Sequence, residues 1–202
     1  ENVKNNENCI NGQILEQFSA SGLAFKKVEN KTYILTAAHF CDAIDDYSNH
    51  YPYKFEYILS LKSELDGKIY SYNIEYSDSI SDLCLLSSER LNIENTVKLS
   101  NKMPQKGEKI YTVSAPLGIH YEFAALKFEG IYSGCYYGNC IYSIPTINGS
   151  SGSIVVNKRG RIIGMLQAAP QQFPSMGMGV GINDIISFLE VYESITGIDL
   201  HN

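Results

Sequence analysis

The sequence predicts an all-β protein made of two small β subdomains, with a single helix at the C-terminal end. Short runs rich in β-branched and aromatic residues recur along the chain and are separated by Gly, Asn, Asp or Pro. Regular short strands with such punctuation are typical of β-sandwiches and β-barrels, not of βαβ units. The segment LSNKMPQKGEK, residues 99–109, interrupts these runs and divides the chain into halves of similar length.

The expected strands follow the apolar runs within each half. Examples are GQILEQF, SGLAFKKV, KTYILTA, YKFEYIL and DLCLLSS in the first half, and EKIYTVSA, NCIYSIP, GSIVVN and GRIIGMLQAA in the second. The residues NKRG, between SIVV and RIIG, predict a hairpin turn. We therefore expect an N-terminal tail over residues 1–12, an N-terminal subdomain over 13–100 and a C-terminal subdomain over 101–182.

Residues 183–202 are expected to form the closing helix and a short tail. Asn183 is a residue type that caps helix N-termini, and Gly197 is a type that follows their C-termini. The apolar residues that recur near one face of this helix are Ile185, Phe188, Leu189 and Tyr192.

Composition narrows the range of functions. The 202 residues are 44% hydrophobic, enough to bury a sizeable core. The net charge is −6 and Lys and Arg form no cluster, which argues against nucleic acid or an anionic membrane as a partner. No apolar run approaches the roughly 20 residues that span a bilayer. The sequence leaves the oligomeric state open.

The five cysteines do not form a pattern that predicts a disulfide scaffold, because their number is odd and their spacing is irregular. Cys135 and Cys140 flank YYGN, a hairpin-like loop that can bring them within bonding distance, so a reduced pair and a single disulfide both stay open. A zinc site would need two more ligands near this pair, and the sequence offers no second CxxC or nearby His. We therefore expect neither a metal nor a cofactor.

The stretch TINGSSGSIV, residues 146–155, contains the candidate nucleophile. A nucleophilic serine needs main-chain N–H groups aimed at the developing oxyanion, and a glycine two residues before it allows the backbone to turn them inward. A glycine directly after it lets the substrate pass close by. Only Ser151 has both, Gly149 and Gly152. The N–H groups of Gly149 and Ser151 would form the oxyanion hole. Most Gly/Ser clusters are turns, so the assignment depends on a base elsewhere in the chain.

Two other residues could complete such a site. His39 ends the apolar strand of YILTAAHFC, which would deliver it to a crevice, whereas the remaining histidines, His50, His120 and His201, are interpreted as structural. Asp82 begins the apolar run of SDLCLL, where a carboxylate is costly unless a donor such as an imidazole N–H satisfies it.

Together, TAAH, SDLCLL and GSSGS resemble the chymotrypsin-like serine peptidases, also in their order along the chain, His, then Asp, then Ser. The bacterial branches, the HtrA-like domains and the glutamyl endopeptidases, are the most similar. ASGLAF resembles their GSGF, VSAPLG resembles IGNPFG, and GSSGSIVVNKRGRIIGM resembles a segment of the glutamyl enzymes. The resemblance covers residues 13–189.

The resemblance implies two six-stranded antiparallel β-barrels with the site between them, His39 as general base, Asp82 as its orienter and Ser151 as nucleophile. Two departures matter. Ser150 stands where trypsins have the Asp that pairs with a new N-terminus, so activation by that ion pair is not expected. No cysteine in the strand before Cys41 can form the corresponding disulfide of trypsins.

The resemblance also indicates where the P1 side chain of a substrate would bind. Pro145 occupies the position of the Asp that selects Arg and Lys in trypsins, and Leu166 that of the His used by glutamyl enzymes. Thr146 matches a hydroxyl of the glutamyl enzymes, but without the imidazole an anionic P1 side chain would lack a charged partner. The expected pocket is uncharged and selects an apolar or small P1 residue; its candidates are Pro145, Thr146, Leu166, Gln167, Ala168 and Ala169.

The sequence therefore predicts a serine endopeptidase with a polypeptide substrate. A catalytically silent binding protein of the same fold is the first alternative, and a protease that cuts itself from a viral or other precursor is the second. The Asn-, Ile-, Lys- and Tyr-rich composition suits a bacterial or viral genome. A secreted or periplasmic bacterial protein is favoured, and the compartment stays open.

Overall fold

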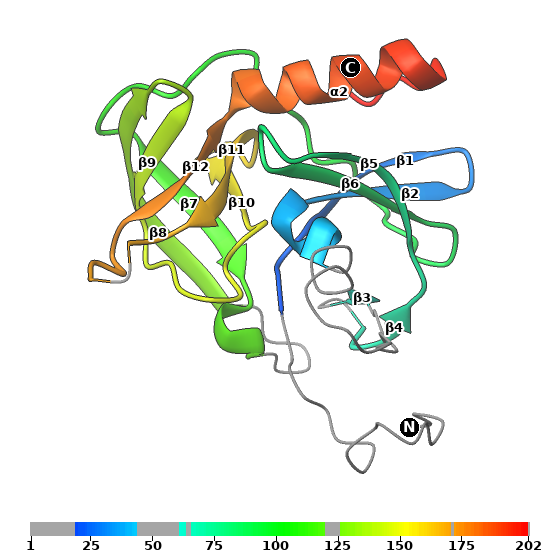
Figure 1. Cartoon of the computed structure of the whole chain (residues 1–202), viewed down its shortest axis with the longest axis horizontal. Helices are drawn as coiled ribbons and strands as arrows, with labels where there is room; N and C mark the ends of the chain where they lie inside the picture. Colours follow the sequence, from blue (N-terminus) through cyan, green and yellow to red (C-terminus); the bar gives the residue numbers. More distant parts are fainter. Residues whose placement is uncertain (1–18, 44–60, 64–65, 120–125, 171, 202) are drawn as a thin grey trace, which may run out of the picture.

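The computed structural model describes residues 19–43, 61–63, 66–119, 126–170 and 172–201 (Figure 1). The N-terminal half forms a four-stranded antiparallel sheet in the order β1-β2-β6-β5 and a separate pair, β3-β4. Its strands are β1 (Leu23–Val28), β2 (Lys31–Thr36), β3 (Leu61–Lys62), β4 (Ile69–Tyr70), β5 (Asn73–Asp78) and β6 (Leu83–Ser88). The central strands β2 and β6 are apolar and buried over almost their whole length, as their sequences TYILT and LCLL require.

The C-terminal half is a closed six-stranded barrel in the order β10-β11-β12-β9-β8-β7. Its strands are β7 (Lys109–Ser114), β8 (Leu126–Tyr136), β9 (Asn139–Ser143), β10 (Ile154–Asn157), β11 (Ile162–Ala168) and β12 (Gly177–Gly181). A short 3₁₀ turn, η1 (Pro116–Gly118), follows β7. The predicted turn NKRG joins β10 to β11, where the N–H of Gly160 donates to the carbonyl of Asn157.

The all-β prediction and one six-stranded barrel are confirmed, whereas a second closed barrel is not found among the described residues. Two of the expected strands, GQILEQF and YKFEYIL at residues 12–18 and 53–59, lie outside the described residues. The described part of the N-terminal half contains a four-stranded sheet with β1 and β5 at its edges.

The largest buried cluster lies where the two halves and the C-terminal helix meet. It combines Phe25 and Leu35 of the sheet with Met165 of the barrel and Phe188 of the helix. Figure 1 shows this helix, α2, running across both halves. Each half has a second cluster of its own, inside the barrel around Tyr142 and on the opposite face of the sheet around Ile34. The halves are thus joined by a shared apolar core.

Helix α2 (Ile182–Thr196) begins one residue earlier than the sequence suggested. Asn183 is not the N-cap. Gly181 takes that position, and its N–H donates to the Asp184 carboxylate at 3.0 Å. Asp184, the third residue of the helix, thus accepts the N–H of the N-cap residue, which is one of the two bonds of a capping box, and its negative charge is favourable near the helix N-terminus. Gly197 ends the helix in a left-handed conformation, with φ of 74°. This helix is shorter than a bilayer is thick, and none in the described part of the chain is apolar and long enough to cross a membrane.

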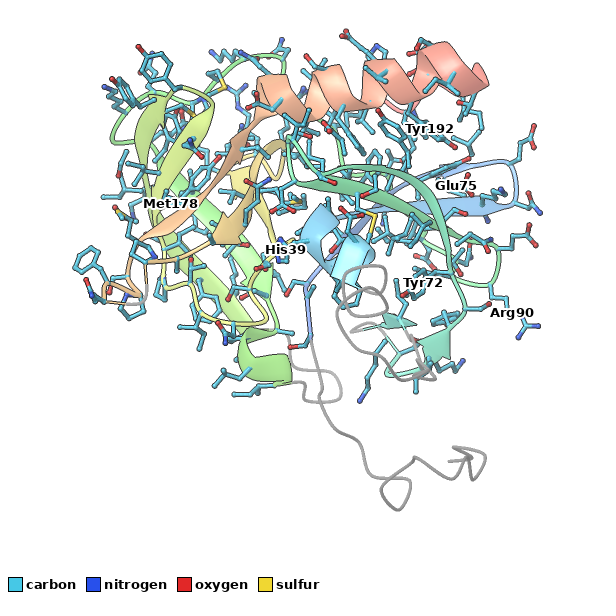
Figure 2. The ribbon with its side chains drawn as sticks, in the orientation of Figure 1. His39, Tyr72, Glu75, Arg90, Met178 and Tyr192 are labelled. Atoms are coloured by element: carbon cyan, nitrogen blue, oxygen red, sulfur yellow. A yellow bond between two sulfur atoms is a disulfide. The ribbon has the colours of Figure 1, made fainter. Side chains whose placement is uncertain are left out.

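A partly buried carboxylate, that of Glu75, links the helix to the sheet. Glu75 on β5 lies 3.1 Å from the ammonium of Lys31 on β2, and accepts hydrogen bonds from Ser87 on β6 and from Tyr192 on α2 (Figure 2). Burial raises the pKa of Glu75, but these donors outweigh it and hold the pKa below its ordinary value. The charged form is therefore the stable one in the folded protein.

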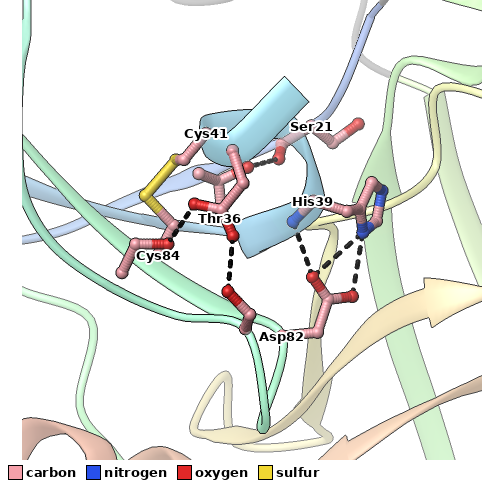
Figure 3. The surroundings of a disulfide bond; sticks show 9 residues. Ser21, Thr36, His39, Cys41, Asp82 and Cys84 are labelled. Atoms are coloured by element: carbon pink, nitrogen blue, oxygen red, sulfur yellow. Dashed lines mark hydrogen bonds and ion pairs between the residues drawn. A yellow bond between two sulfur atoms is a disulfide. The ribbon is translucent and has the colours of Figure 1, made fainter. Parts of the chain in front are cut away.

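Among the described residues, two disulfides join strands or segments of the same half. Cys135 and Cys140 are bonded across the β8–β9 hairpin, where they are paired in register. Cys41 is bonded to Cys84 on β6, 43 residues further along the chain (Figure 3). The sequence did not indicate this second pairing; it indicated only that Cys41 has no partner in the strand before it. The bond links the segment that follows His39 to the strand that follows Asp82.

Candidate active site

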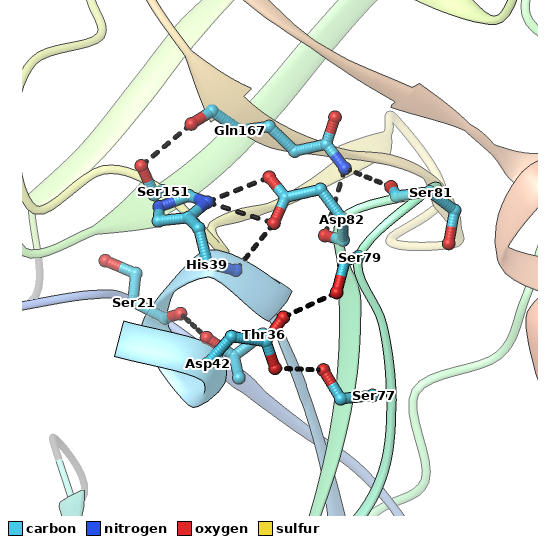
Figure 4. A network of polar contacts seen from close by, with 10 residues as sticks. All are labelled: Ser21, Thr36, His39, Asp42, Ser77, Ser79, Ser81, Asp82, Ser151 and Gln167. Atoms are coloured by element: carbon cyan, nitrogen blue, oxygen red, sulfur yellow. Dashed lines mark hydrogen bonds and ion pairs between the residues drawn. The ribbon is translucent and has the colours of Figure 1, made fainter. Parts of the chain in front are cut away.

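His39 and Asp82 meet at the edge of the N-terminal sheet. His39 lies in the helical segment that begins at residue 38, directly after β2, and Asp82 lies in the turn before β6. The Nδ1 atom of His39 is 3.0 Å from Asp82 Oδ1 and 2.9 Å from Oδ2, and the main-chain N–H of His39 donates to Oδ1 at 2.8 Å (Figure 4). The carboxylate therefore fixes both the position and the tautomer of the imidazole, with the proton on Nδ1.

The charge environment favours protonation of His39. The hydrogen bond to Asp82 raises the pKa of the imidazole above its usual value. Partial burial acts in the opposite direction, and the negative charges of Asp82 and Asp42 add to the rise. The Asp42 carboxylate is itself held by the hydroxyls of Ser77 and Ser79, at 2.9 and 2.8 Å. The side chain of His39 remains 52% exposed, so the imidazole can exchange protons with solvent.

Asp82 adopts a left-handed backbone conformation, with φ of 52°. Aspartate tolerates this region better than most residues, yet it still needs support from its surroundings. The side-chain amide of Gln167, on β11 of the barrel, donates to the main-chain carbonyls of Ser81 and Asp82 at 2.6 and 3.1 Å. A residue of one half thus holds the turn that presents the carboxylate of the other half.

Among the three serines of GSSGS, only Ser151 is open to solvent. Ser150 and Ser153 are each 1% exposed, whereas Ser151 is half-buried. The Ser151 hydroxyl donates to the main-chain carbonyl of Gln167 at 2.8 Å. The flanking Gly152 lies close to the main chain of Ala37, two residues before His39, where a Cβ on Gly152 would be 3.1 Å from the Ala37 nitrogen. The hydrogen bonds of Ser151 and of His39 are drawn in Figure 4, where the Ser151 hydroxyl is bonded to Gln167.

The peptide between Asn148 and Gly149 has a defined orientation. The carbonyl of Asn148 accepts a 2.6 Å hydrogen bond from the N–H of Leu117 in η1. Because the C=O and N–H of one trans peptide point in opposite directions, the N–H of Gly149 points away from η1. Gly149 has φ of 89°, and a Cβ there would lie 2.6 Å from the carbonyl oxygen of Ala115, so only glycine fits.

Two N–H groups are expected to form the oxyanion hole, those of Gly149 and Ser151. Neither donates a hydrogen bond to an acceptor in the described part of the chain. An N–H pair left open beside a half-buried hydroxyl can bind the oxygen of a substrate carbonyl.

The six residues expected to line a P1 pocket do not all face one space. Leu166 is 0% exposed and Thr146 2%, and both side chains lie 2.6 Å from where a Cβ of Gly177 would be. Gln167 instead directs its amide toward the Asp82 turn. Among the others, Pro145 and Ala168 are exposed and Ala169 is partly buried. Gly177 was not among the expected residues, and no local signal indicates it: Leu166 pairs with Gly179, while Gly177 pairs with Tyr142 of β9, so its place beside Leu166 depends on strand register.

Of the remaining histidines, His201 lies in the described part of the chain. His201 has its Nδ1 atom 3.0 Å from a carboxylate oxygen of Glu193, in the C-terminal segment after α2. His50 and His120 lie outside the described residues.

The chain matches one protein family and several known proteins. The profile of the trypsin-like peptidase domain family matches residues 20–165. This range is more than half of the chain and includes His39, Asp82 and Ser151. Among curated proteins, the chain is similar to the serine protease Do-like HtrB of Bacillus subtilis (strain 168), with 25% identity over 181 residues that cover 82% of this chain and 36% of that protein.

Two further similarities point to the same fold. The serine protease Do-like HtrA of Lactobacillus helveticus is 27% identical over 166 residues, which cover 77% of this chain and 37% of that protein. The chain thus spans little more than a third of the length of these relatives. Among solved structures, a serine endoprotease from Yersinia pestis superposes with a TM-score of 0.67 and 18% identity, over 89% of this chain and 60% of that one.

Proposed function

Because the chain belongs to the trypsin-like peptidase family, we propose that it is a serine endopeptidase that cuts polypeptides through an acyl-enzyme. Ser151 is the nucleophile, His39 the general base, and Asp82 the group that orients the imidazole. The observation that carries this proposal is the contact of His39 Nδ1 with both carboxylate oxygens of Asp82. With the proton held on Nδ1, the lone pair of the neutral ring is on Nε2, the atom that is proposed to take the proton of Ser151.

The reaction begins with a rotation of the Ser151 hydroxyl. It leaves the carbonyl of Gln167 and donates to Nε2 of His39. The oxygen then attacks the substrate carbonyl while its proton passes to Nε2, and Asp82 stabilises the imidazolium that results. The N–H groups of Gly149 and Ser151 donate hydrogen bonds to the negative oxygen of the tetrahedral intermediate.

The intermediate collapses by breaking the C–N bond of the substrate. The imidazolium gives its proton to the departing amine, which leaves as the new N-terminus, and the substrate acyl group stays as an ester on Ser151. Water then attacks this ester with His39 again as base. The carboxylic product departs and the Ser151 hydroxyl is restored. The chemistry of these residues is complete without a metal or cofactor.

The P1 side chain is proposed to be apolar or small. The support is the convergence of Leu166, Thr146 and Gly177, none of which bears a charge. The Thr146 hydroxyl donates to the carbonyl of Ile144, so it is already used. A substrate profile dominated by Arg, Lys or Glu at P1 would contradict this part of the proposal.

One observation favours a second candidate, a trypsin-fold binding protein without turnover. The Ser151 hydroxyl donates to Gln167 and not to His39. A nucleophile that keeps this bond would bind a polypeptide without cutting it. Precursor self-processing shares the mechanism above and differs only in the substrate.

The experiment that separates these functions is labelling with a fluorophosphonate, mapped by mass spectrometry. The wild-type protein should be modified at Ser151, because a serine with an assembled base attacks phosphorus readily. The His39→Ala variant should lose the modification while it remains folded by circular dichroism. Two variants control for the site of labelling. Ser151→Ala should lose the modification, and Ser153→Ala should keep it. A folded wild-type protein that takes no label would favour the binding protein.

A further inference from the structure

Ser21 lies in the short segment before β1 and makes contacts that no role described so far requires. It is 9% exposed. Its hydroxyl donates to the carbonyl of Gly149 at 2.8 Å and accepts the N–H of Ala115 at 3.0 Å. A hydroxyl has one proton to donate and lone pairs to accept, so both bonds can exist at once. A side chain of the N-terminal half thus bridges two main-chain groups of the C-terminal half.

The main chain of Ser21 adds two further bonds. Its N–H donates to the carbonyl of Ser151 at 2.8 Å. Its own carbonyl accepts the Thr36 hydroxyl of β2 at 2.8 Å (Figure 3). Ser21 therefore holds the carbonyls of Gly149 and Ser151, the same two residues whose N–H groups would bind the oxyanion, and it is anchored to the central strand of the sheet.

The bond from Ala115 to Ser21 connects Ser21 with the peptide that precedes Gly149. Ala115 is the residue directly before the turn η1, and in η1 the N–H of Leu117 donates to the carbonyl of Asn148. The peptide before Gly149 is thus held through η1, and the peptide after it is held by Ser21 directly. With both peptides held, the N–H of Gly149 has little freedom to turn away.

From this arrangement we propose that the Ser21 hydroxyl is a positioning group for the oxyanion hole. It does not touch the substrate, and it acts through Gly149. The proposal rests on the serine endopeptidase function proposed above. Its consequence is that the N-terminal half supplies more than the base: it also keeps the N–H donors of the barrel in the geometry that the transition state needs.

The test compares Ser21→Ala with Thr32→Val. Thr32 is a matched control because its buried hydroxyl also donates to a main-chain carbonyl, that of Leu91, in the same half of the molecule. We expect Ser21→Ala to lower kcat by about 10- to 100-fold with KM changed less than threefold, since losing a whole oxyanion donor costs ~10²–10³. Thr32→Val should lower the thermal midpoint similarly but leave kcat within twofold.

A peptide boronic acid with an uncharged P1 residue supplies a second measurement. Its tetrahedral adduct places an oxygen where the oxyanion forms, so its affinity should fall in Ser21→Ala by about the same factor as kcat. Ser21→Thr, which keeps a hydroxyl, should recover most of the loss, and Ser21→Cys, a weak donor, should not.

The outcomes separate the two proposals. If the wild-type protein is active and Ser21→Ala keeps both its kcat and its boronate affinity, the positioning role is wrong and the endopeptidase stands. If Thr32→Val loses kcat as strongly as Ser21→Ala, the effect reports general stability and the positioning role is likewise wrong. If the wild-type protein neither cuts peptides nor binds the boronate, the endopeptidase proposal itself fails.

Discussion

The C-terminal barrel and the N-terminal sheet differ in what holds their strands in place. Every strand of the barrel has two hydrogen-bonded neighbours, so its backbone groups are satisfied within the ring. In the described part of the N-terminal half, the sheet has β1 and β5 as edge strands, and side-chain links connect it further: the Cys41–Cys84 disulfide, the bonds of Glu75 to Lys31, Ser87 and Tyr192, and the packing of α2. The barrel can therefore present a loop on a rigid frame, whereas the described sheet presents its residues with the help of specific cross-links.

The residues of the proposed chemistry are divided along the same line. Ser151 and the N–H groups proposed for the oxyanion hole belong to the barrel, and His39 and Asp82 belong to the half that contains the sheet. Ser21 and Gln167 are the residues by which each half reaches into the site of the other. Variants in the two halves should therefore differ in whether they change activity or stability, and in how large the change is.

The largest expected effect is on activity, and it tests the division directly. Ser151→Ala should lower kcat by on the order of 10⁶, because it removes the nucleophile. Asp82→Asn should lower kcat by about 10⁴, because the amide favours the wrong tautomer of His39. Neither variant should change KM greatly. Peptide-cleavage kinetics provide the measurement, and a loss below tenfold for Asp82→Asn would contradict its role.

The two disulfides compare the halves in stability. The loop closed by Cys41–Cys84 spans 43 residues and that closed by Cys135–Cys140 spans 5. In the chain-entropy description, removing the first should cost about 4 kcal/mol and removing the second about 2 kcal/mol. Urea unfolding of Cys41→Ser/Cys84→Ser and Cys135→Ser/Cys140→Ser, under non-reducing conditions, measures both.

Only the first of these pairs should also affect activity, since its bond joins the segments that carry His39 and Asp82. Equal losses of stability in the two double variants would show that the sheet does not depend on its cross-link more than the barrel does.

Gln167 tests whether the barrel supports Asp82. Gln167→Ala removes the donors to the Ser81 and Asp82 carbonyls and should lower kcat by about 10- to 100-fold, since small displacements of catalytic groups cost this much. The P1 preference should stay the same, because the amide is bonded to the carbonyls of Ser81 and Asp82. Cleavage of a peptide library distinguishes support of the Asp82 turn from a role in P1 selection. A changed P1 profile with unchanged kcat would show that Gln167 lines the P1 pocket and does not support Asp82.

A variant of Glu75 tests the link that this carboxylate forms between β2, β6 and α2. Its pKa is lowered in the folded state, so its charge stabilises the fold above the pKa of the unfolded chain, about 4.3, and this contribution is lost as the pH falls through the folded value. Glu75→Gln should lower the free energy of unfolding by about 1 kcal/mol at pH 7, and by less below pH 4.

The barrel offers a matched control for this variant. Glu129 lies 2.7 Å from Lys109 across β7 and β8, but both side chains are more than half exposed. Glu129→Gln should not change stability measurably, because exposed ion pairs contribute little. Urea unfolding at pH 7 and pH 3 gives the free energy of unfolding of both variants. Similar decreases in the two variants would contradict the prediction that Glu75 stabilises its half more than Glu129 stabilises the barrel.

The smallest expected effect is on the pH profile. His39 must be neutral to act as a base and its pKa is raised, so kcat/KM should fall on the acid side with a midpoint above the usual value of about 6.5. Asp42 contributes to the rise, so Asp42→Asn should move this midpoint to lower pH while the plateau above pH 8 stays the same. A midpoint that moves upward would contradict the assigned charge interaction.

Much of the fold and of the candidate site could be predicted because the signals are local. The strand runs, the hairpin at NKRG and the end of α2 at Gly197 depend on residues next to one another. The same holds for GSSGS, in which glycines two before and one after Ser151 determine how that turn can be arranged. The order of TAAH, SDLCLL and GSSGS indicated the family. By itself, then, the sequence determined the β architecture, the family and which three residues to consider.

The tertiary structure decided what depends on residues far apart in the chain. The pairing of Cys41 with Cys84, the Gln167 amide on the Asp82 turn, and the Ser21 hydroxyl on Gly149 join residues 43, 85 and 128 positions apart. No periodicity or motif encodes such contacts, because they arise only when two folded halves pack together and each buried polar group must find a partner.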